Sequence, residues 1–271
     1  MTQQRILITG GAGKVAQMLR PRLARDGRSL RLLDLREPEP LPGTGDEEVV
    51  LGSVTDAAAM AEACRGVDAV IHLGGQSVEA TAENVIDLNI RGTLTTLEAT
   101  RAAGVRRIVL ASSNHAVGFC GRDEAPVAAN SPGRPDTFYG LSKVTMEAAG
   151  HMYADRYGLD VIALRIGSWF PTPPGVRGLA TWLSPDDGAR LVEACLAVGS
   201  PGFRIVWGIS RNTRRWFSLA EGQAIGYHPE DDAETYAAEL IAEHGEPDFT
   251  SDAELNRVGG AWCEVELGKP M

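Results

Sequence analysis

Tyr139 and Lys143 are the residues whose types and spacing best suit proton transfer. They lie four positions apart in a segment with helical spacing of apolar residues, which Asp136 is placed to cap, so both side chains project from one side of a helix. A phenol with a pKa of about 10 is a poor base at neutral pH, but a neighbouring ammonium stabilises its phenolate. We therefore expect this pair to abstract a proton from a hydroxyl group, although the spacing alone favours a solvated surface pair.

A glycine turn directly follows the first apolar run of the chain, residues 6–8. Gly10 permits a tight turn and Gly13 lets the backbone approach a pyrophosphate, while the helix expected next presents its unpaired N–H groups. A Walker A loop is disfavoured because Ile8 stands where that loop needs a glycine, and Val15 where it needs a magnesium-binding Ser or Thr. The alternative is a loop whose glycines serve turn geometry only.

Asp34 lies about 20 residues beyond this turn, at the end of the second apolar run. A carboxylate at that position can accept hydrogen bonds from the hydroxyls of an adenosine ribose and would repel a 2′-phosphate. The position favours NAD over NADP, although Arg36 could soften the preference. An ordinary turn residue at the end of a strand is the alternative for Asp34.

The elements that position these residues alternate between short apolar runs and segments of helical spacing. Continuous apolar runs indicate strands covered on both faces, and the alternation predicts a doubly wound parallel α/β sheet, a Rossmann fold. After residue 168 the pattern becomes irregular, so we expect a core of residues 1–168 and a smaller substrate lobe of residues 169–271, packed as one unit. The expected strands contain residues 6–8, 30–33, 49–51, 69–73, 108–111 and 161–166, and the expected helices include residues 15–23, 86–97, 185–198 and 233–244.

Composition and charge exclude several classes of function. The chain has 271 residues, with 26 Lys and Arg against 36 Asp and Glu, and its formal charge of -10 disfavours nucleic acid and anionic lipid as partners. No apolar stretch reaches the roughly 18 residues of a membrane span, and an apolar run within a few residues of Met1 leaves no room for a signal peptide. The four cysteines and five histidines form no metal-binding pattern. We expect a cytoplasmic protein without a metal.

The order of these motifs resembles the short-chain dehydrogenase/reductase superfamily, of the extended, NAD-dependent epimerase/dehydratase-like type. Its elements here are a glycine turn, an acidic strand end, a strand ending in Ser-Ser-Asn-His115, and Tyr139-x-x-x-Lys143. Further strings, at residues 72–79 (HLGGQSVE), 111–115 (ASSNH) and 165–168 (RIGS), are similar to those of uronate dehydrogenases, a bacterial branch of that superfamily. The resemblance implies oxidation of C1 of D-galacturonate or D-glucuronate by NAD to an aldarolactone.

The resemblance also implies a role for particular residues. Tyr139 would be the general base, Lys143 would lower its pKa and hold the nicotinamide ribose, and Ser113 is the weaker catalytic candidate, because either Ser113 or Asn114 could fill the family's Ser/Thr position. The expected NAD-binding residues are Gly10, Gly13, Lys14, Val15, Asp34, Ser53, Val54, Leu73, Gly74, Gly75, Asn89 and Lys143. The expected substrate-binding residues are Ser77, Ser113, Asn114, His115, Ser168 and Arg177, with Arg177 as the carboxylate clamp.

Two other functions compete with this one. A nucleotide-sugar epimerase or dehydratase would use the same motifs, but the roughly one hundred residues after Ser168 favour a monosaccharide, by the size of the lobe that relatives build. A non-catalytic dinucleotide sensor would need the glycine turn but not Tyr139 and Lys143. The third glycine of the turn is replaced by Ala16, and Ser53 stands where many relatives carry an acidic residue. We expect a small sugar acid as the partner, and a homo-oligomer.

Overall fold

The computed structural model of the chain describes residues 4–45 and 47–271. The strands are β1 (Gln4–Thr9), β2 (Arg28–Asp34), β3 (Glu47–Leu51), β4 (Ala69–His72), β5 (Arg107–Ser113), β6 (Asp160–Ile166), β7 (Ser168–Trp169), β8 (Trp182–Leu183) and β9 (Phe203–Gly208). The α-helices are α1 (Lys14–Leu23), α2 (Ala57–Cys64), α3 (Ala82–Val85), α4 (Gly92–Ala102), α5 (Phe138–Tyr157), α6 (Gly178–Thr181), α7 (Pro185–Ala197), α8 (Ala220–Gln223) and α9 (Ala237–His244). A π-helix, η1 (Ile86–Arg91), joins α3 to α4, and η2 (Asn114–Val117), η3 (Arg122–Glu124), η4 (Ala233–Tyr236) and η5 (Gly260–Glu264) are 3₁₀ helices.

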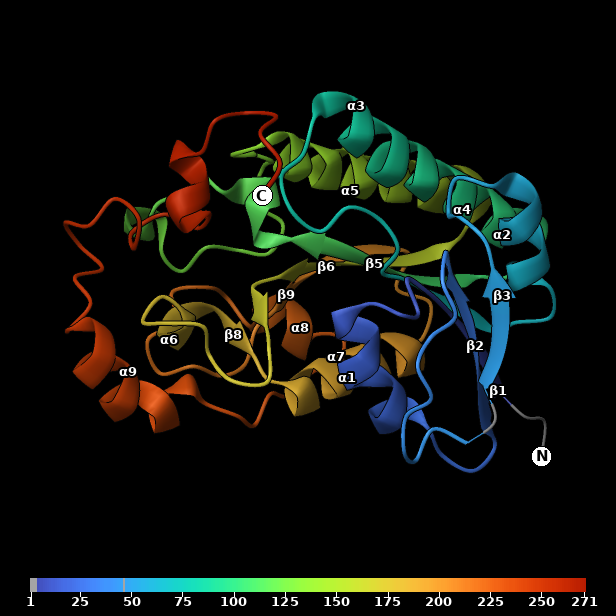
Figure 1. Ribbon diagram of the computed structural model, residues 1–271, viewed down its shortest axis with the longest axis horizontal. Helices are drawn as coiled ribbons and strands as arrows, with labels where there is room; N and C mark the ends of the chain where they lie inside the picture. Colours follow the sequence, from blue (N-terminus) through green and yellow to red (C-terminus); the bar gives the residue numbers. More distant parts are fainter. Residues whose placement is uncertain (1–3, 46) are drawn as a thin grey trace.

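A parallel sheet of seven strands, in the order β3-β2-β1-β4-β5-β6-β9, forms the middle layer (Figure 1). The chain runs outward from β1 to β3 and then returns to the other side of β1 with β4, so the strand order reverses between β1 and β4. In open α/β sheets, ligands bind outside the carboxyl ends of the strands at such a reversal. The predicted doubly wound sheet is confirmed, and the glycine turn after β1 lies at its switch point.

Strand burial follows the apolar runs except at one edge. Ile6, Leu7 and Ile8 of β1 are fully buried, as expected for a strand covered on both faces. Residues 49–51 were expected to be covered in the same way, and that prediction is wrong, since Leu51 is 61% exposed. The reason is position, because β3 is the edge strand and pairs only with β2.

Helices cover both faces of the sheet (Figure 1). On one face, α1 and α7 contribute Leu19, Leu23 and Leu191 to a buried cluster with strand residues such as Ile8 and Ile71. On the other face, α2, α4 and α5 contribute Met60, Leu97 and Met146 to a second cluster with the opposite sides of the same strands. α7 and β9 both follow residue 168, so the later part of the chain is built into these layers.

The helix that carries Tyr139 and Lys143 begins one residue later than the sequence indicates. Thr137, and not the predicted Asp136, is the N-cap of α5, and its hydroxyl accepts the Gly140 N–H at 3.0 Å. Asp136 is turned to His115 instead. α5 ends at Gly158, whose φ of 69° suits a residue without a side chain.

A π-helical turn breaks the expected helix of residues 86–97. We expected Ile86, Ile90, Leu94 and Leu97 to share one buried side, but Ile86 is 56% exposed and only Leu97 is fully buried. The wider turn of η1 changes the angular spacing of side chains, so Val85 and Asn89 face inward before α4 begins. The four-residue spacing therefore holds for α4 but not for the whole segment.

The C-terminal segment returns across the molecule to the start of α5 (Figure 1). Buried Glu79, in the loop after β4, accepts the N–H groups of Tyr139 at 2.8 Å and Gly268 at 2.9 Å. The last residues thus lie beside Tyr139, although more than a hundred positions separate them along the chain. Among the helices in the described part of the chain, none has the length and apolar character needed to span a membrane.

Candidate active site

The glycine turn after β1 touches the loop after β4. Gly10 has a φ of 71°, and a Cβ there would lie 2.9 Å from the backbone nitrogen of Gly74. A side chain at Gly10 would thus be strained and would collide with backbone. The hydroxyl of Thr9 accepts the Gly74 N–H at 3.1 Å, which fixes the Leu73-Gly74-Gly75 loop against the turn. This contact lies at the switch point of the sheet, where ligands of open α/β sheets bind in a crevice.

The N-terminus of α1 opens directly onto this crevice. Gly13 is the N-cap, no side chain caps the helix, and its first turn, which includes Lys14 and Val15, holds no acidic residue. Asp34, at the end of β2, accepts the Ala12 N–H at 3.0 Å, and exposed Arg36 donates to the Ala12 carbonyl at 3.3 Å. The partial positive charge of the helix start is therefore available to an anion, with a carboxylate at one border.

Three further predicted cofactor residues surround the same loops. Val54 is buried and packs so closely on Gly74 that a Cβ there would lie 2.6 Å from its Cγ1. Ser53, the residue before it, bonds Thr55 through its hydroxyl at 2.8 Å. Asn89 is buried and bonds the Gln76 N–H at 2.7 Å and the Ser142 hydroxyl at 2.9 Å. Asn89 thus ties the loop after β4 to α5, which is a supporting role.

Tyr139 and Lys143 lie side by side, buried, on the first two turns of α5. The Lys143 Nζ is 5.2 Å from the centre of the Tyr139 ring and donates to the Ala111 carbonyl at 2.7 Å. The pKa of Tyr139 is raised to about 12 because the phenol is buried, and the nearby Ser113 only partly opposes this shift. Burial lowers the pKa of Lys143 to about 8, against the charge of Glu147. Lys143 is therefore charged at neutral pH, and Tyr139 is protonated.

We expected Lys143 to lower the pKa of Tyr139. In the protein without cofactor that expectation is wrong, because the pKa of Tyr139 is raised. Lys143 loses its proton near pH 8, well before Tyr139 ionises near pH 12, so no ammonium remains to stabilise the phenolate at that pH. At neutral pH the ammonium is present and favours movement of the phenol proton. A Tyr139 that works as a base needs this charge together with a second one.

Ser113 and Asn114 have different contacts, which bears on the family's Ser/Thr position. The Ser113 hydroxyl lies near enough to the Tyr139 side chain to lower the pKa of the phenol, against the effect of burial. The Asn114 amide donates to the Val258 carbonyl at 2.8 Å and accepts the Ser113 hydroxyl at 3.2 Å. The geometry favours Ser113 for the family's Ser/Thr position and gives Asn114 the task of anchoring residue 258.

His115, Tyr139 and Trp262 of the C-terminal segment contact one another through their rings. Its ring stacks on Trp262 with centres 4.0 Å apart and meets the Tyr139 ring edge-on at 5.9 Å. Its Nδ1 is 2.6 Å from an Asp136 oxygen. Burial lowers the pKa of His115, and the nearby Asp136 opposes this shift. Trp262 was not anticipated, because its distance along the chain hides its contact with these residues.

Arg177 is partly buried at the same end of the site and has no acidic partner among the described residues. One of its NH2 groups donates to the Val258 carbonyl, which Asn114 also contacts. Its Nε is buried and has no hydrogen-bond partner among residues 4–45 and 47–271. Burial lowers the pKa of this guanidinium, and the largest opposing charge is Asp136. A buried cation in this state favours an anionic ligand.

The other two predicted substrate-binding serines, Ser77 and Ser168, lie in different parts of the site. The Ser168 hydroxyl is 2.9 Å from that of Thr181, which itself donates to the Arg177 carbonyl at 3.3 Å, so Ser168 adjoins the Arg177 segment. Ser77 is exposed in the loop after β4, next to Gln76. The structure therefore gathers Ser113, Asn114, His115 and Arg177 closely and places Ser77 at the rim of the loop.

Two buried carboxylates that support Tyr139 and Lys143 escaped the sequence analysis. Glu79 accepts the N–H of Tyr139, and its Ser-Val-Glu string was the only available signal. Glu147, one turn after Lys143 on α5, forms a buried ion pair with Arg165 at 2.7 Å and accepts the Ser112 hydroxyl at 2.6 Å. Both carboxylates fix α5 against neighbouring segments.

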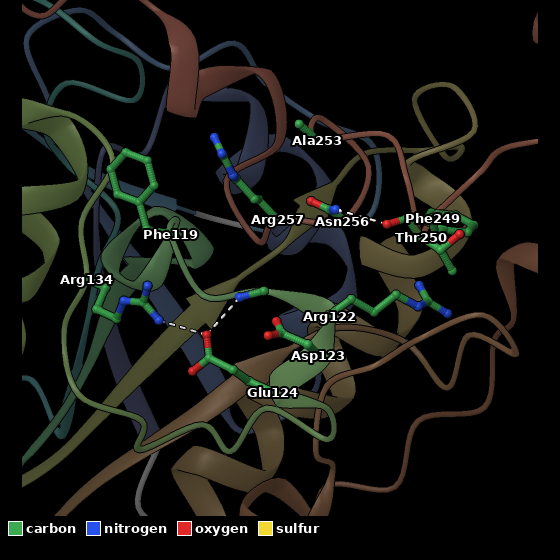
Figure 2. A pocket seen from close by; sticks show the side chains of 11 residues that line it. Phe119, Arg122, Asp123, Glu124, Arg134, Phe249, Thr250, Ala253, Asn256 and Arg257 are labelled. Atoms are coloured by element: carbon green, nitrogen blue, oxygen red, sulfur yellow. Dashed lines mark hydrogen bonds and ion pairs between the residues drawn. The ribbon is translucent and has the colours of Figure 1, made fainter.

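A cavity of about 830 Å³ lies on the other side of the segment that contains Val258. Figure 2 shows Arg122, Arg134 and Arg257 around it, with Arg134 directed to Glu124 at 2.7 Å. None of the residues expected at the site lines this cavity. It adjoins the site at Phe119, next to Gly118, and at Arg257, next to Val258, and Tyr139 does not line it, so it is not where Tyr139 would meet a substrate.

Comparisons with known proteins agree with this geometry. The NAD-dependent epimerase/dehydratase family matches residues 6–181. The chain is 42% identical to a uronate dehydrogenase of Pseudomonas putida over 88% of each chain, and 38% identical to one of Agrobacterium fabrum over 98% of this chain and 99% of that one. A crystal structure of a mutant uronate dehydrogenase from Agrobacterium tumefaciens complexed with NAD is similar, with a TM-score of 0.90 and 36% identity over 97% of this chain and 98% of that chain. The chain therefore belongs to the NAD-dependent epimerase/dehydratase family and, within it, groups with the uronate dehydrogenases.

Proposed function

We propose that this protein oxidises a free hexuronic acid, D-galacturonate or D-glucuronate, at C1 to the aldarolactone, with NAD as the hydride acceptor. Tyr139 is the proton acceptor, Lys143 supplies positive charge beside it, and Arg177 binds the substrate carboxylate. The relatives named above carry the same activity in their names.

The unsatisfied guanidinium of Arg177 is the main reason to propose an acidic sugar as the substrate. A guanidinium offers two parallel N–H donors to a carboxylate, and a buried guanidinium without such a partner is costly. Within the described residues the Arg177 side chain hydrogen-bonds only the Val258 carbonyl, and its Nε is unsatisfied. A uronate carboxylate would satisfy both the charge and the free donor, whereas an uncharged sugar would satisfy neither.

The residues at the switch point fit a dinucleotide. Gly10, Gly13 and Gly74 leave space for backbone contact, the uncapped start of α1 suits a pyrophosphate, and Asp34 suits the adenosine ribose. When bound, NAD accepts the hydride from C1, and its oxidised ring adds a positive charge near Tyr139. Lys143, one turn after Tyr139 on α5, would hold the nicotinamide ribose.

Proton transfer then follows from the arrangement of the protein groups. Tyr139 takes the proton of the anomeric hydroxyl while the C1 hydride leaves and the C1–O double bond forms. Ser113, which adjoins Tyr139, would donate its hydroxyl to the same oxygen, and the Lys143 ammonium lowers the energy of the phenolate. Burial of all three residues excludes water and strengthens these interactions.

The two parts of the chain would divide these tasks. Residues 1–168 carry the glycine turn, Asp34 and Tyr139, whereas residues 169–271 carry Arg177 on the substrate side. We further propose a homo-oligomer, since Leu141, Met152 and Tyr157 of α5 expose large apolar side chains. Light scattering of the purified protein would distinguish an oligomer from a monomer.

The test compares charged and uncharged sugars. Purified protein with NAD should form reduced cofactor with D-galacturonate or D-glucuronate, and far less with D-galactose or D-glucose. Arg177→Met should raise KM for the uronates about 100-fold, the value of a buried charged hydrogen bond, and leave the rate with the neutral sugars unchanged. Arg211→Met, at an arginine that donates to an exposed carbonyl, is the matched control.

Absence of reduced cofactor with both uronates would overturn this proposal. A UDP-sugar that is turned over in the same assay would favour a nucleotide-sugar enzyme instead. Binding of NAD without turnover of any sugar would favour a dinucleotide sensor.

A further inference from the structure

A buried carboxylate, Asp136, lies next to His115 and is enclosed by backbone from several segments. The Asp136 side chain is completely buried, and its Oδ2 is 2.6 Å from the His115 Nδ1. Its Oδ1 accepts the Thr137 hydroxyl at 2.9 Å. Both carboxylate oxygens are therefore occupied by protein groups, and Asp136 itself does not face a substrate.

Three glycines from separate segments make room for this carboxylate. A Cβ at Gly118 or at Gly259 would lie 2.0 Å from its Oδ2, and a Cβ at Gly140 would lie 2.8 Å from its Oδ1. The Gly259 N–H also donates to the Gly118 carbonyl at 2.9 Å, which closes the enclosure. Any other residue at Gly118 or Gly259 would displace the Asp136 carboxylate, so the surrounding backbone is shaped around it.

This enclosure determines which nitrogen of His115 carries a proton. A carboxylate only accepts hydrogen bonds, so Nδ1 donates to Asp136. Nε2 makes no hydrogen bond to any residue in the described part of the chain, and stacking on Trp262 fixes the plane of the ring. Burial lowers the pKa of His115, so the ring is neutral at pH 7 and Nε2 is a hydrogen-bond acceptor.

The charged groups around His115 act in opposite directions. Asp136 and Glu79 raise the pKa of His115, while burial and Arg177 lower it. Asp136 is also the largest charge that raises the pKa of Arg177. The direct contact of Asp136 is with His115, and Asp136 reaches Arg177 only through its charge.

We infer that Asp136 is a positioning residue that holds His115 with Nδ1 protonated and Nε2 free to accept a hydrogen bond from a substrate hydroxyl. The inference rests on the proposed function. It assigns to Asp136 a role in sugar recognition without contact with the sugar.

A second His–Asp pair on the surface provides a control. His151 and Asp155 of α5 lie 3.6 Å apart, and both side chains are more than half exposed. Water competes for both groups of such a pair, so the carboxylate does not decide which ring nitrogen carries the proton. The two pairs have the same residue types but differ in burial.

The experiment replaces Asp136 by Asn, which keeps the shape but removes the charge. We expect Asp136→Asn to lower kcat/KM for D-galacturonate about 10- to 100-fold, mainly through KM, with unchanged affinity for NAD. Asp155→Asn should change neither value. In a His115→Gln background, Asp136→Asn should lower kcat/KM less than threefold, because its effect passes through His115. A full and additive loss in that background would overturn the inference.

A second measurement needs neither turnover nor a variant. Nitrogen NMR of the cofactor-free wild-type protein should show His115 protonated at Nδ1 and unprotonated at Nε2 at pH 7, and a proton on Nε2 alone would overturn the inference. Absence of uronate oxidation by the wild-type protein would instead overturn the proposed function, so the two failures are distinguishable.

Discussion

Replacing Lys143 by Met tests the electrostatic step of proton transfer. The Tyr139 pKa of about 12 means that about one molecule in ten thousand carries a phenolate at pH 8 without further charge. The Lys143 ammonium, charged below its pKa of about 8, is the nearest protein cation, with its Nζ 5.2 Å from the Tyr139 ring centre. Met keeps most of the side-chain volume and removes only this charge and its bond to Ala111.

The size of the effect follows from Coulomb's law. Two unit charges at that distance interact by about 3 kcal/mol at an effective dielectric constant of about 20. At about 1.4 kcal/mol for each factor of ten, Lys143→Met should lower kcat/KM about 200-fold. Because the pKa of Lys143 lies below that of Tyr139, the rise of the wild-type rate with pH should level off near pH 8 as the ammonium is lost. In the variant, the rise should continue to higher pH.

The assay records initial rates of NAD reduction with D-galacturonate at saturating NAD between pH 6 and 10. Lys269→Met removes an exposed lysine whose Nζ is 3.8 Å from Glu266, and it should match the wild type. Circular dichroism checks that both variants fold. A Lys143→Met enzyme within threefold of the wild type, with the same pH profile, would refute the electrostatic account.

Three further predictions concern the elements around the site. Gly10→Ala should lower NAD affinity at least 100-fold in a fluorescence titration, because its Cβ would lie 2.9 Å from the Gly74 nitrogen. Gly27→Ala, where a Cβ meets nothing within 4 Å, should cost only about 1 kcal/mol of stability, and an equal loss of NAD affinity in both would contradict the reasoning. Glu79→Gln should lower the free energy of unfolding by about 2 kcal/mol in urea titrations, since an amide nitrogen would face the Tyr139 or Gly268 N–H, whereas exposed Glu83→Gln should be neutral. Glu147→Gln should lower the free energy of unfolding by about 3 to 5 kcal/mol, because it leaves the buried Arg165 charge uncompensated. Replacement of both Glu147 and Arg165 by Met should cost less. A larger loss in the double variant would count against this explanation.

Local patterns explain which parts of the fold and site could be predicted. The glycine turn, Asp34 and the Tyr139–Lys143 spacing each depend on a few consecutive residues. The structure has Asp34 bonded to the turn and Lys143 beside Tyr139 on α5. The buried parallel strands were also readable, because a strand covered on both faces carries a continuous apolar run. The same rule gave the wrong prediction of burial for Val49 and Leu51, because a run of apolar residues does not indicate whether its strand lies at the edge of the sheet.

Contacts across long sequence distances explain what could not be predicted. Trp262, Val258 and Gly259 reach His115, Asn114 and Asp136 only because the C-terminal segment returns to the start of α5. Asp136 looked like a helix cap because capping is the commonest task of an aspartate before a helix, yet Thr137 serves there and Asp136 is held by His115. The π turn at Ile86–Arg91 has no simple local signature either.

Turnover by Tyr139→Phe is the most direct test of the central assignment. The account predicts that this variant binds NAD as the wild type does and loses at least about a thousandfold in kcat with D-galacturonate, because no other described group takes the anomeric proton. A Tyr139→Phe enzyme that binds NAD and oxidises the uronate within tenfold of the wild-type rate would contradict it.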